Sequence, residues 1–227
     1  MIEKHTSVVI PVYNSGTILY ELASRLIQVL ENISTSYEII LVDDGSLAET
    51  KVALKNIAEK YPAIKILTHE KNLGQHVSIL HGLIAANAEW IIVMDDDLQD
   101  SPEEIKTLFQ HATEKNKCIV AIRKNNQFSF FRKSSSYLFN ALLSFASGKN
   151  FSHASGNFGL YHSSLIQRIK TFPEHLFYFP VAIRKVAQHI TYIETLHAKR
   201  SEGKSTYTFT KMIKLCATAF KAAKYKL

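Results

Sequence analysis

The sequence lacks the features that mark disulfide-rich, zinc-binding, membrane-spanning or secreted proteins. Its 227 residues include two cysteines, Cys118 and Cys216, too few for a disulfide framework or a cysteine-rich zinc site. The histidines show no zinc-ligand spacing. No apolar run reaches the roughly 18 residues of a membrane-spanning helix, and the first residues lack the apolar core of a secretory signal peptide. These absences predict a protein of the reducing cytosol.

Long Gly, Ser or Pro stretches and internal repeats are also absent. The length suits one sizeable α/β domain with a proper core and is short for two. Hydrophobic residues make up 46% and charged residues 21%, as in ordinary globular proteins. We expect one domain over residues 1–205, followed by a C-terminal extension over 206–227.

Acidic residues are the minority, with 20 of them against 27 Lys and Arg, so the net charge is +7. The excess indicates an anionic partner or serves solubility alone. It is concentrated from Lys199 onward, where Glu202 is the one acid. A predicted helix from about Thr208 mixes apolar residues with lysines. It could lie on an anionic membrane or pack on the domain with a solvated basic face. No nucleic-acid-binding module is recognisable.

Short apolar runs alternate with helical periodicity over the first 125 residues. The predicted strands are 7–12, 38–42, 64–67, 90–94 and 118–122, and the predicted helices between them begin near Thr17, Glu49, Gly74 and Ser101. This alternation predicts a Rossmann-like, mostly parallel sheet flanked by helices. Residues 126–205 should complete the sheet and build the acceptor side, with helices at 134–147, 163–170 and 180–188 and strands at 158–161 and 190–196.

Polar clusters follow three of the predicted strands, at Tyr13-Asn14, Asp43 to Ser46, and Asp95 to Asp97. Ligands of parallel sheets bind outside the carboxyl ends of the strands. Three successive carboxylates repel one another unless a cation lies among them. We therefore expect a ligand site at this edge of the sheet.

The aspartate triplet indicates a divalent metal, because Asp-x-Asp at a strand end directs hard oxygen ligands to one spot. Asp95, Asp97 and Gln99 are the candidate ligands of Mg²⁺ or Mn²⁺, and Asp96 should point away. A metal there would neutralise a leaving diphosphate. A solvated acidic loop or a helix cap is the alternative. The Asp43-Asp44 pair could bind a base or ribose, or form an ordinary turn.

Four segments, SVVIPVYN, EIILVDDGS, NLGQ and WIIVMDDDLQDSPEEI, resemble glycosyltransferase family 2 in their order and spacing. The branch that makes polyprenyl-phosphate sugars, including dolichyl-phosphate mannose synthase, is the most similar. The resemblance spans roughly residues 7–210. It implies a GT-A fold, a nucleotide-sugar donor, a divalent metal and inversion at the anomeric carbon.

The resemblance also implies roles for individual residues. The positions that match the nucleotide-sugar site are Pro11, Tyr13, Asn14, Asp43, Asp44, Lys71, Asp95 and Asp96. Those that match the donor diphosphate and the acceptor phosphate are Arg123, Arg132, Ser136, Asn157, Arg200 and Ser205. Asp97 and Arg200 are the main candidates for catalysis. Arginine suits these roles because its guanidinium grips phosphate oxygens with two hydrogen bonds.

One stretch departs from the family pattern. Many bacterial relatives have Gly-Asp-Phe-Arg-Leu where this chain has Asn157 and Gly159, so a carboxylate and an arginine are missing. A sugar-hydroxyl acceptor needs a general base, whereas a phosphate acceptor is already anionic. The departure favours a phosphate acceptor. For a hydroxyl acceptor, Glu174 is the remaining candidate base.

We therefore predict an inverting, metal-dependent glycosyltransferase with a polyprenyl-phosphate acceptor, active in cell-surface glycan synthesis and peripheral on the inner face of the membrane. One alternative is transfer to a sugar hydroxyl of a growing polysaccharide or lipopolysaccharide. Another is a degenerate relative that binds nucleotide or membrane without turnover. A sugar-phosphate nucleotidyltransferase is disfavoured, because the first strand is not followed by a Gly-rich basic loop.

Overall fold

The computed structural model describes residues 2–123, 155–195 and 209–225. These residues form one α/β domain whose elements are β1 (Ile2–Val12), α1 (Ile18–Ile33), β2 (Ser34–Asp43), α2 (Ala48–Lys60), β3 (Ile64–Thr68), α3 (Gln75–Ala85), β4 (Trp90–Val93), η1 (Pro102–Glu104), α4 (Ile105–Gln110), β5 (Cys118–Arg123), β6 (Ser155–His162), α6 (Ser163–Ile169), η2 (Glu174–Leu176), α7 (Phe179–Val186), β7 (Thr191–Thr195) and α8 (Phe209–Lys224).

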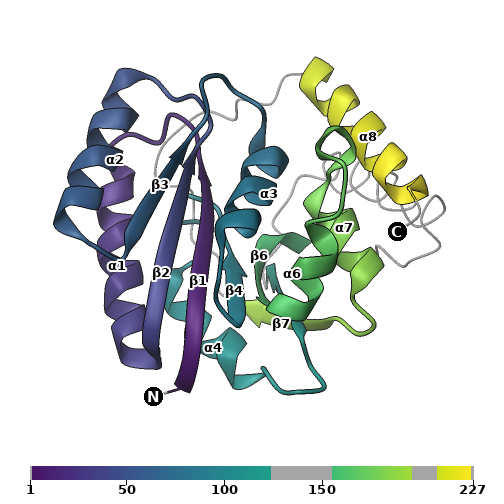
Figure 1. The fold of residues 1–227 in the computed structure, drawn as a ribbon, viewed down its shortest axis with the longest axis horizontal. Helices are drawn as coiled ribbons and strands as arrows, with labels where there is room; N and C mark the ends of the chain where they lie inside the picture. The colour runs from purple at the N-terminus through teal and green to yellow at the C-terminus, as the bar shows by residue number, and fades with distance from the viewer. Residues whose placement is uncertain (1, 124–154, 196–208, 226–227) are drawn as a thin grey trace.

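The strands form a seven-stranded sheet in the order β3-β2-β1-β4-β6-β5-β7. Every adjacent pair is parallel except those of β6, which runs antiparallel to both β4 and β5. The predicted mostly parallel sheet is confirmed. Chain order reverses between β1 and β4, which is where ligands of such sheets bind. Figure 1 shows β1 and β2 running side by side to the same edge.

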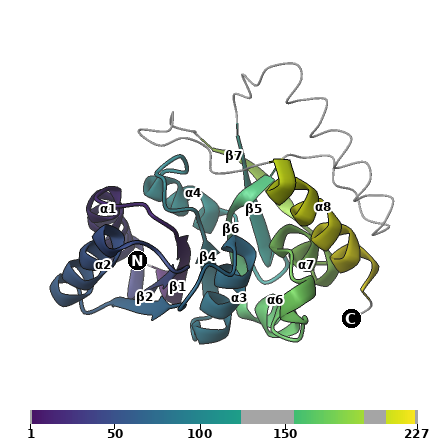
Figure 2. The ribbon, with the colours of Figure 1, turned by 90° about the horizontal axis from the view of Figure 1, so that it is seen from above.

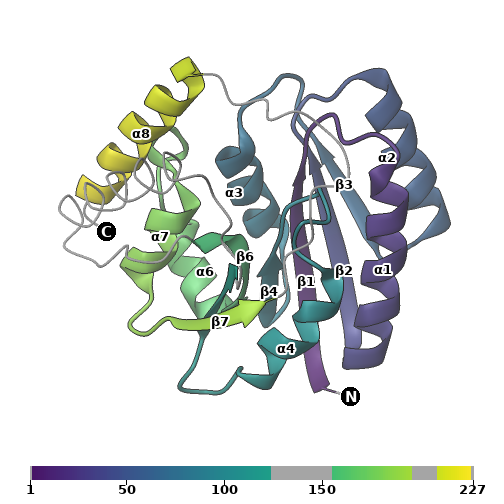
Figure 3. The same cartoon turned by 180° about the vertical axis from the view of Figure 1, so that it is seen from behind.

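Helices cover both faces of the sheet (Figure 2). Val8 and Ile10 of β1 pack toward α1 and α4, whereas Val9 packs toward α3. Burial on both faces explains why the predicted strands are continuous apolar runs without alternation. From behind, α1 and α2 lie at the β3 end of the sheet and α7 and α8 at the other end of the molecule (Figure 3).

Most predicted elements of the first 125 residues are present, with shifted ends. β1 begins at Ile2, earlier than predicted, and α3 ends at Ala85 because Ala86 turns to an extended backbone. The helix predicted from Ser101 begins with the 3₁₀ turn η1. The short turn η2 was not predicted. The predicted helix over 134–147 lies outside the described residues.

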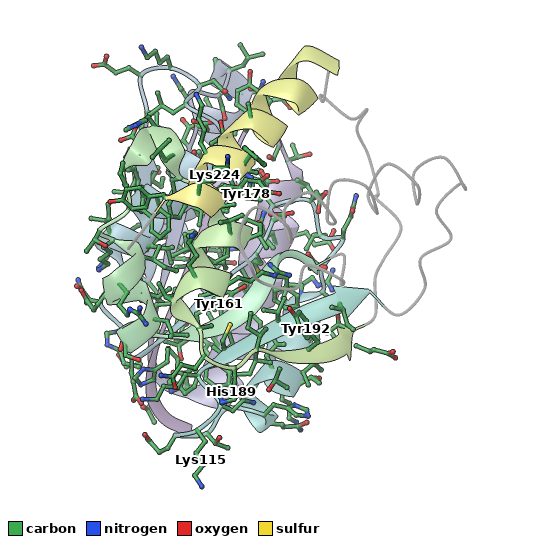
Figure 4. The ribbon with its side chains drawn as sticks, turned by 90° about the vertical axis from the view of Figure 1, so that its right-hand side faces the viewer. Lys115, Tyr161, Tyr178, His189, Tyr192 and Lys224 are labelled. Atoms are coloured by element: carbon green, nitrogen blue, oxygen red, sulfur yellow. The ribbon has the colours of Figure 1, made fainter. Side chains whose placement is uncertain are left out.

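The described part of α8 packs on the domain through small residues. Ala219, Ala222 and Ala223 are buried against Tyr178 and Val181, and Figure 4 shows Tyr178 beside α8. Within the described ranges, the structure contains no helix with the length and apolarity needed to span a bilayer. The predicted domain boundary at 205/206 stays a prediction.

Candidate active site at the carboxyl edge of the sheet

The aspartate triplet follows β4 at the centre of the sheet. The Met94 N–H donates to the Val9 carbonyl at 3.2 Å, and the Asp44 N–H donates to the Val12 carbonyl at 2.9 Å. These bonds hold the residues after β4 and β2 against the end of β1. The three polar clusters that follow β1, β2 and β4 therefore meet at one edge.

Asp95 is held from two sides by amide groups. Its Oδ1 accepts a hydrogen bond from Gln75 Nε2 at 2.8 Å and another from Asn157 Nδ2 at 3.2 Å. Gln75 begins α3, and Asn157 lies in β6, the antiparallel strand. The carboxylate is therefore oriented by two elements far apart in the sequence. A negative group at position 157 would repel Asp95, so the amide of Asn157 suits this place.

Asp96 turns toward the loop after β1. Its Oδ2 accepts hydrogen bonds from the backbone N–H of Tyr13, at 3.3 Å, and from the hydroxyl of Ser15. Burial, with a smaller contribution from the negative Asp95 and Asp97, raises the pKa of Asp96 to about 6 against the lowering effect of the Ser15 and Tyr13 hydrogen bonds. The structure thus gives Asp96 contacts that fix the β1 loop, in a direction different from those of Asp95.

Asp97 begins a tight turn. Its Oδ1 accepts the backbone N–H of Gln99 at 3.1 Å, and Leu98 between them has a φ of 55°. Beyond the turn, Arg25 of α1 donates to both carboxylate oxygens of Glu103, at 3.0 and 2.7 Å. The Arg25 hydrogen bond lowers the pKa of Glu103 to about 2. This pair joins α1 to η1 and so fixes the far end of the turn.

The residues of the triplet fit a divalent cation of the Mg²⁺ or Mn²⁺ kind. Among the residues that the structure describes, no three His, Cys, Asp or Glu side chains converge as a complete protein-only metal cage. Mg²⁺ is typically bound by one or two carboxylates together with substrate phosphates and water. Asp95 and Asp97 at a strand end supply hard oxygens of that kind. The donor set is therefore suited to a cation that arrives with a diphosphate.

The loop after β1 is interlocked with the loop after β2. Asn14 has a φ of 55°, a conformation that Asn tolerates better than most residues. Its Oδ1 accepts the N–H of Leu47 at 2.8 Å, and its own N–H donates to Ser46 Oγ at 3.0 Å. Pro11 is buried within β1, whereas Tyr13 is 41% exposed. Tyr13 is thus an exposed aromatic residue among the predicted nucleotide-site residues.

Asp43 and Asp44 are both almost fully buried but face different surroundings. Asp43 Oδ1 accepts the Ser46 N–H at 2.9 Å, while its Oδ2 is buried with no hydrogen-bond partner. Asp43 lines a hollow of about 560 Å³ between α2 and β3, together with Lys51, Leu54, Lys55, Ala58, Glu59, Ile66 and Thr68. An unpaired buried carboxylate oxygen is costly, so Asp43 is held in an unfavourable environment beside this hollow.

Asp44 points to the loop before α3. Its two oxygens accept the N–H groups of Leu73 at 2.8 Å and Gly74 at 2.9 Å, and Oδ1 also contacts His69 Nδ1 at 3.0 Å. Gly45 allows the two loops to meet, because a Cβ there would lie 2.7 Å from the Lys71 carbonyl carbon. The exposed Lys71 thus borders the Asp43-Asp44 turn.

Comparison with known proteins agrees with this geometry. A family model described as glycosyl transferase family 2 matches residues 7–170. The chain belongs to this family.

Curated relatives of this family 2 member are about one-third identical to it in sequence. The undecaprenyl-phosphate 4-deoxy-4-formamido-L-arabinose transferase of Serratia proteamaculans is 35% identical over 213 residues, 93% of this chain. The protein of the same name from Salmonella choleraesuis is 36% identical over 219 residues, also 93% of this chain. The chain spans 65% of the length of each of these relatives.

Solved structures share its fold at low sequence identity. A mannosyltransferase from Pyrobaculum calidifontis, in complex with GDP-Man and Mn²⁺, aligns with a TM-score of 0.65 at 15% identity, covering 90% of this chain and 59% of the other. Glucosyl-3-phosphoglycerate synthase from Mycobacterium tuberculosis, with Mn²⁺, UDP and phosphoglyceric acid, aligns with a TM-score of 0.68 at 12% identity, covering 97% and 78%. The predicted GT-A fold is confirmed.

The predicted phosphate-binding residues are described only in part. Arg123 ends β5, where its backbone pairs with Thr195 of β7. β5 and β7 both run parallel to β4, so the chain leaves both strands at the edge that carries Asp95. Arg132, Ser136, Arg200 and Ser205 lie outside the described residues, so their roles stay predictions.

Glu174, the candidate base, lies in η2 with its side chain 53% exposed. Its Oε2 contacts His81 Nε2 at 3.3 Å. The departure at Gly159 also has a local reason, since a Cβ there would lie 2.6 Å from the Ile119 carbonyl oxygen. An arginine does not fit at 159 on this backbone.

Sequence reasoning missed Gln75 as a site residue. It stands within the NLGQ segment, but its role depends on α3 lying beside the end of β4. The signal available in the sequence was an amide at the first position of a helix that follows a glycine.

Proposed function

We propose that this chain is an inverting glycosyltransferase that moves a sugar from a nucleotide diphosphate to a polyprenyl phosphate. One observation carries the proposal: Asp95, beside Asp97 at the centre of the sheet, is held in place by Gln75 and Asn157. A carboxylate fixed by two amides at a sheet's reversal point is suited to a charged ligand. The curated relatives are longer than this chain, and their names support a polyprenyl phosphate as the acceptor.

The donor would bind along the edge formed by β1, β2 and β4. The exposed Tyr13 would stack on the base, and Asp43, which lines the hollow between α2 and β3, would accept a hydrogen bond from the base or ribose. Lys71, at the border of the same turn, would face the phosphates. Asp95 and Asp97 would hold Mg²⁺ or Mn²⁺ against the diphosphate, a role supported by the Mn²⁺ in the two structural neighbours. When bound, the cation stabilises negative charge on the departing diphosphate.

The acceptor would supply its own nucleophile. A phosphate oxygen attacks the anomeric carbon from the face opposite the donor diphosphate, the bond from that carbon to the diphosphate breaks, and the nucleoside diphosphate leaves. Asn157 bonded to Asp95 is an amide and cannot take a proton as a base. An anionic phosphate needs no base. Arg123, Arg132, Ser136, Arg200 and Ser205 remain the proposed cationic and hydroxyl partners of the two phosphate groups.

A donor screen tests the enzyme proposal. Release of nucleoside diphosphate is measured for a panel of nucleotide sugars, with and without Mn²⁺ and undecaprenyl phosphate. We expect release with at least one donor that depends on both additions. Release with a glycan hydroxyl acceptor and none with polyprenyl phosphate would favour the alternative of polysaccharide or lipopolysaccharide elongation, with Glu174 as base. No release from any donor would support a degenerate binding protein.

We also propose that α8 lies on an anionic membrane surface at the cytoplasmic face. Its described end buries alanines and exposes Phe220, Lys221 and Lys224, and Lys224 Nζ lies 4.6 Å from the centre of the Phe220 ring. An exposed aromatic ring among lysines suits a negatively charged lipid interface.

Flotation with phosphatidylglycerol vesicles at low salt tests this surface. We expect the protein to float, and Lys221→Glu/Lys224→Glu to remain in the pellet. Lys115→Glu is the matched control, because Figure 4 shows Lys115 at the end of the molecule opposite Lys224. Equal flotation of all three proteins would contradict the proposal.

A further inference from the structure

A continuous chain of hydrogen bonds runs from the buried Asp44 to the surface at Glu174. His69 Nδ1 lies 3.0 Å from Asp44 Oδ1, His69 Nε2 lies 2.8 Å from His81 Nδ1, and His81 Nε2 lies 3.3 Å from Glu174 Oε2. The two imidazole rings meet edge to face, with centroids 4.9 Å apart and planes at 89°. Side chains from four separate segments are thus joined in one series of hydrogen bonds. The proposed transfer to a phosphate acceptor does not use this series.

The two ends of this line fix where the protons lie. An ionised carboxylate only accepts hydrogen bonds. His69 must therefore donate from Nδ1 to Asp44, and His81 must donate from Nε2 to Glu174. The remaining nitrogens, His69 Nε2 and His81 Nδ1, face each other at 2.8 Å, so a bond between them needs one further proton.

A hydrogen bond at each of the three contacts requires three protons on the four ring nitrogens of the pair. In that arrangement one ring is an imidazolium and the other is neutral, so the pair shares a single positive charge. With both rings neutral, either two lone pairs face each other or one carboxylate loses its donor. With both rings charged, two N–H groups face each other. The described charged groups in contact with the pair are Asp44 and Glu174, one at each end.

The line continues beyond Asp44 to the aspartate triplet. Asp44 accepts the N–H groups of Leu73 and Gly74, the two residues that precede α3. The next residue, Gln75, donates to Asp95 at 2.8 Å. The side-chain conformation of Asp44 thus fixes the backbone before Gln75. The His69 side chain, which is 9% exposed, fixes that conformation through its contact with Asp44 Oδ1.

We propose that His69 and His81 share one proton and act as positioning residues, holding Gln75 against Asp95 through Asp44 and the start of α3. His69 is the direct support, and His81 supplies its partner and the link to Glu174. Only the activity measurement below rests on the proposed function.

Nitrogen-detected NMR of the full chain, labelled with ¹⁵N-histidine, tests the proton count without turnover. Signals of the pair are assigned by their loss in His69→Asn and His81→Gln. Near neutral pH we expect a proton on His69 Nδ1, a proton on His81 Nε2, and a third shared between the facing nitrogens. Finding His69 protonated on Nε2 alone, or two neutral rings, overturns the proposal.

Enzyme assays test the positioning role. We expect His69→Ala to raise the Mn²⁺ concentration for half-maximal turnover by about 10-fold, as for other residues that orient metal ligands. His69→Asn, whose amide can still donate to Asp44, should recover most of the loss. His81→Gln should keep activity near the wild-type level, since a glutamine amide can both accept and donate a hydrogen bond. His111→Gln is the matched control. His111 is an exposed residue directly after α4, and its Nδ1 contacts the Thr107 carbonyl.

Equal loss in His69→Ala and His69→Asn, or an unchanged Mn²⁺ requirement in both, overturns the positioning role. If the wild-type chain releases no nucleoside diphosphate, the proposed function fails, and the NMR measurement still decides the shared proton. Circular-dichroism melting of each variant separates a folding defect from a local one.

Discussion

The side-chain amide of Gln75 donates to Asp95 Oδ1 at 2.8 Å, which joins the first residue of α3 to the carboxylate that follows β4. This bond lies near the junction of β1 and β4, where the sheet reverses its chain order. It makes the orientation of Asp95 depend on the placement of a helix.

Replacing Gln75 by leucine removes the donor without adding charge. We expect turnover at low Mn²⁺ to fall by roughly 10- to 100-fold, the usual cost of losing a group that orients a metal ligand. A titration of nucleoside diphosphate release against Mn²⁺ measures it, and excess Mn²⁺ should restore part of the rate. Gln110→Leu, at the exposed end of α4, is the control. A rate equal to wild type at every Mn²⁺ concentration would remove Gln75 from the site.

Asparagine substitutions separate the members of the triplet. Asp97→Asn should lower turnover by at least about 100-fold if its carboxylate holds the cation. Asp96→Asn should be much milder, because an asparagine oxygen can still accept from Tyr13 and Ser15. Turnover and its sensitivity to chelation are measured for both. Greater loss in Asp96→Asn than in Asp97→Asn would reverse the assignment of ligands.

Asn157→Asp tests the absence of a base near Asp95. The new carboxylate would stand where an amide now donates at 3.2 Å, and repulsion would raise the pKa of the pair. We expect transfer to undecaprenyl phosphate to fall by about 10-fold near neutral pH and to recover partly at lower pH. Asn116→Asp is the control, because Asn116 lies on the loop before β5 and is distant from Asn157 in the sequence. An increase in rate would instead indicate an acceptor that needs a base.

The half-buried His76, whose Nδ1 is shielded from solvent, predicts a pH dependence of stability. Burial lowers the pKa of His76 from 6.5 to about 4, and its Nδ1 has no partner. The unfolded chain takes up a proton below pH 6.5 that the folded chain does not bind until about pH 4, so stability falls as the pH decreases through this window. The difference is of the order of 3 kcal/mol at pH 4.

His76→Phe should flatten the dependence, since phenylalanine can keep the packing against Tyr178, whose ring centre lies 4.4 Å away. Urea midpoints of the wild type and the variant, measured between these two pH values, test this. Parallel pH profiles for the two proteins would show that other groups cause the loss.

The first half of the fold could be predicted because its signals are local. The run from Val8 to Val12 is apolar throughout since both faces of β1 are covered, and Pro62 closes the predicted helix before β3. The aspartate triplet could be placed at the strand end for the same reason. Local patterns of this kind do not depend on how distant segments meet.

The rest depends on long-range placement. That β6 runs antiparallel, and so brings Asn157 to Asp95, follows from packing of segments 62 residues apart. The sequence indicates only that His81 lies in a helix. Its contacts with His69 and Glu174 form because α3, the loop after β3 and η2 converge. The contacts of Asp96 with the β1 loop were not predicted, because they join residues far apart in the sequence.

The antiparallel β6 has one more consequence. Ile122 near the end of β5 pairs with Ser155 at the start of β6, so the chain departs and returns at neighbouring points on the edge that carries Asp95. Side chains of a strand alternate between the two faces of the sheet, so a slip of β6 by one residue against β4 would turn the Asn157 side chain to the other face. The hydrogen bond to Asp95 thus depends on the pairing register of this one strand.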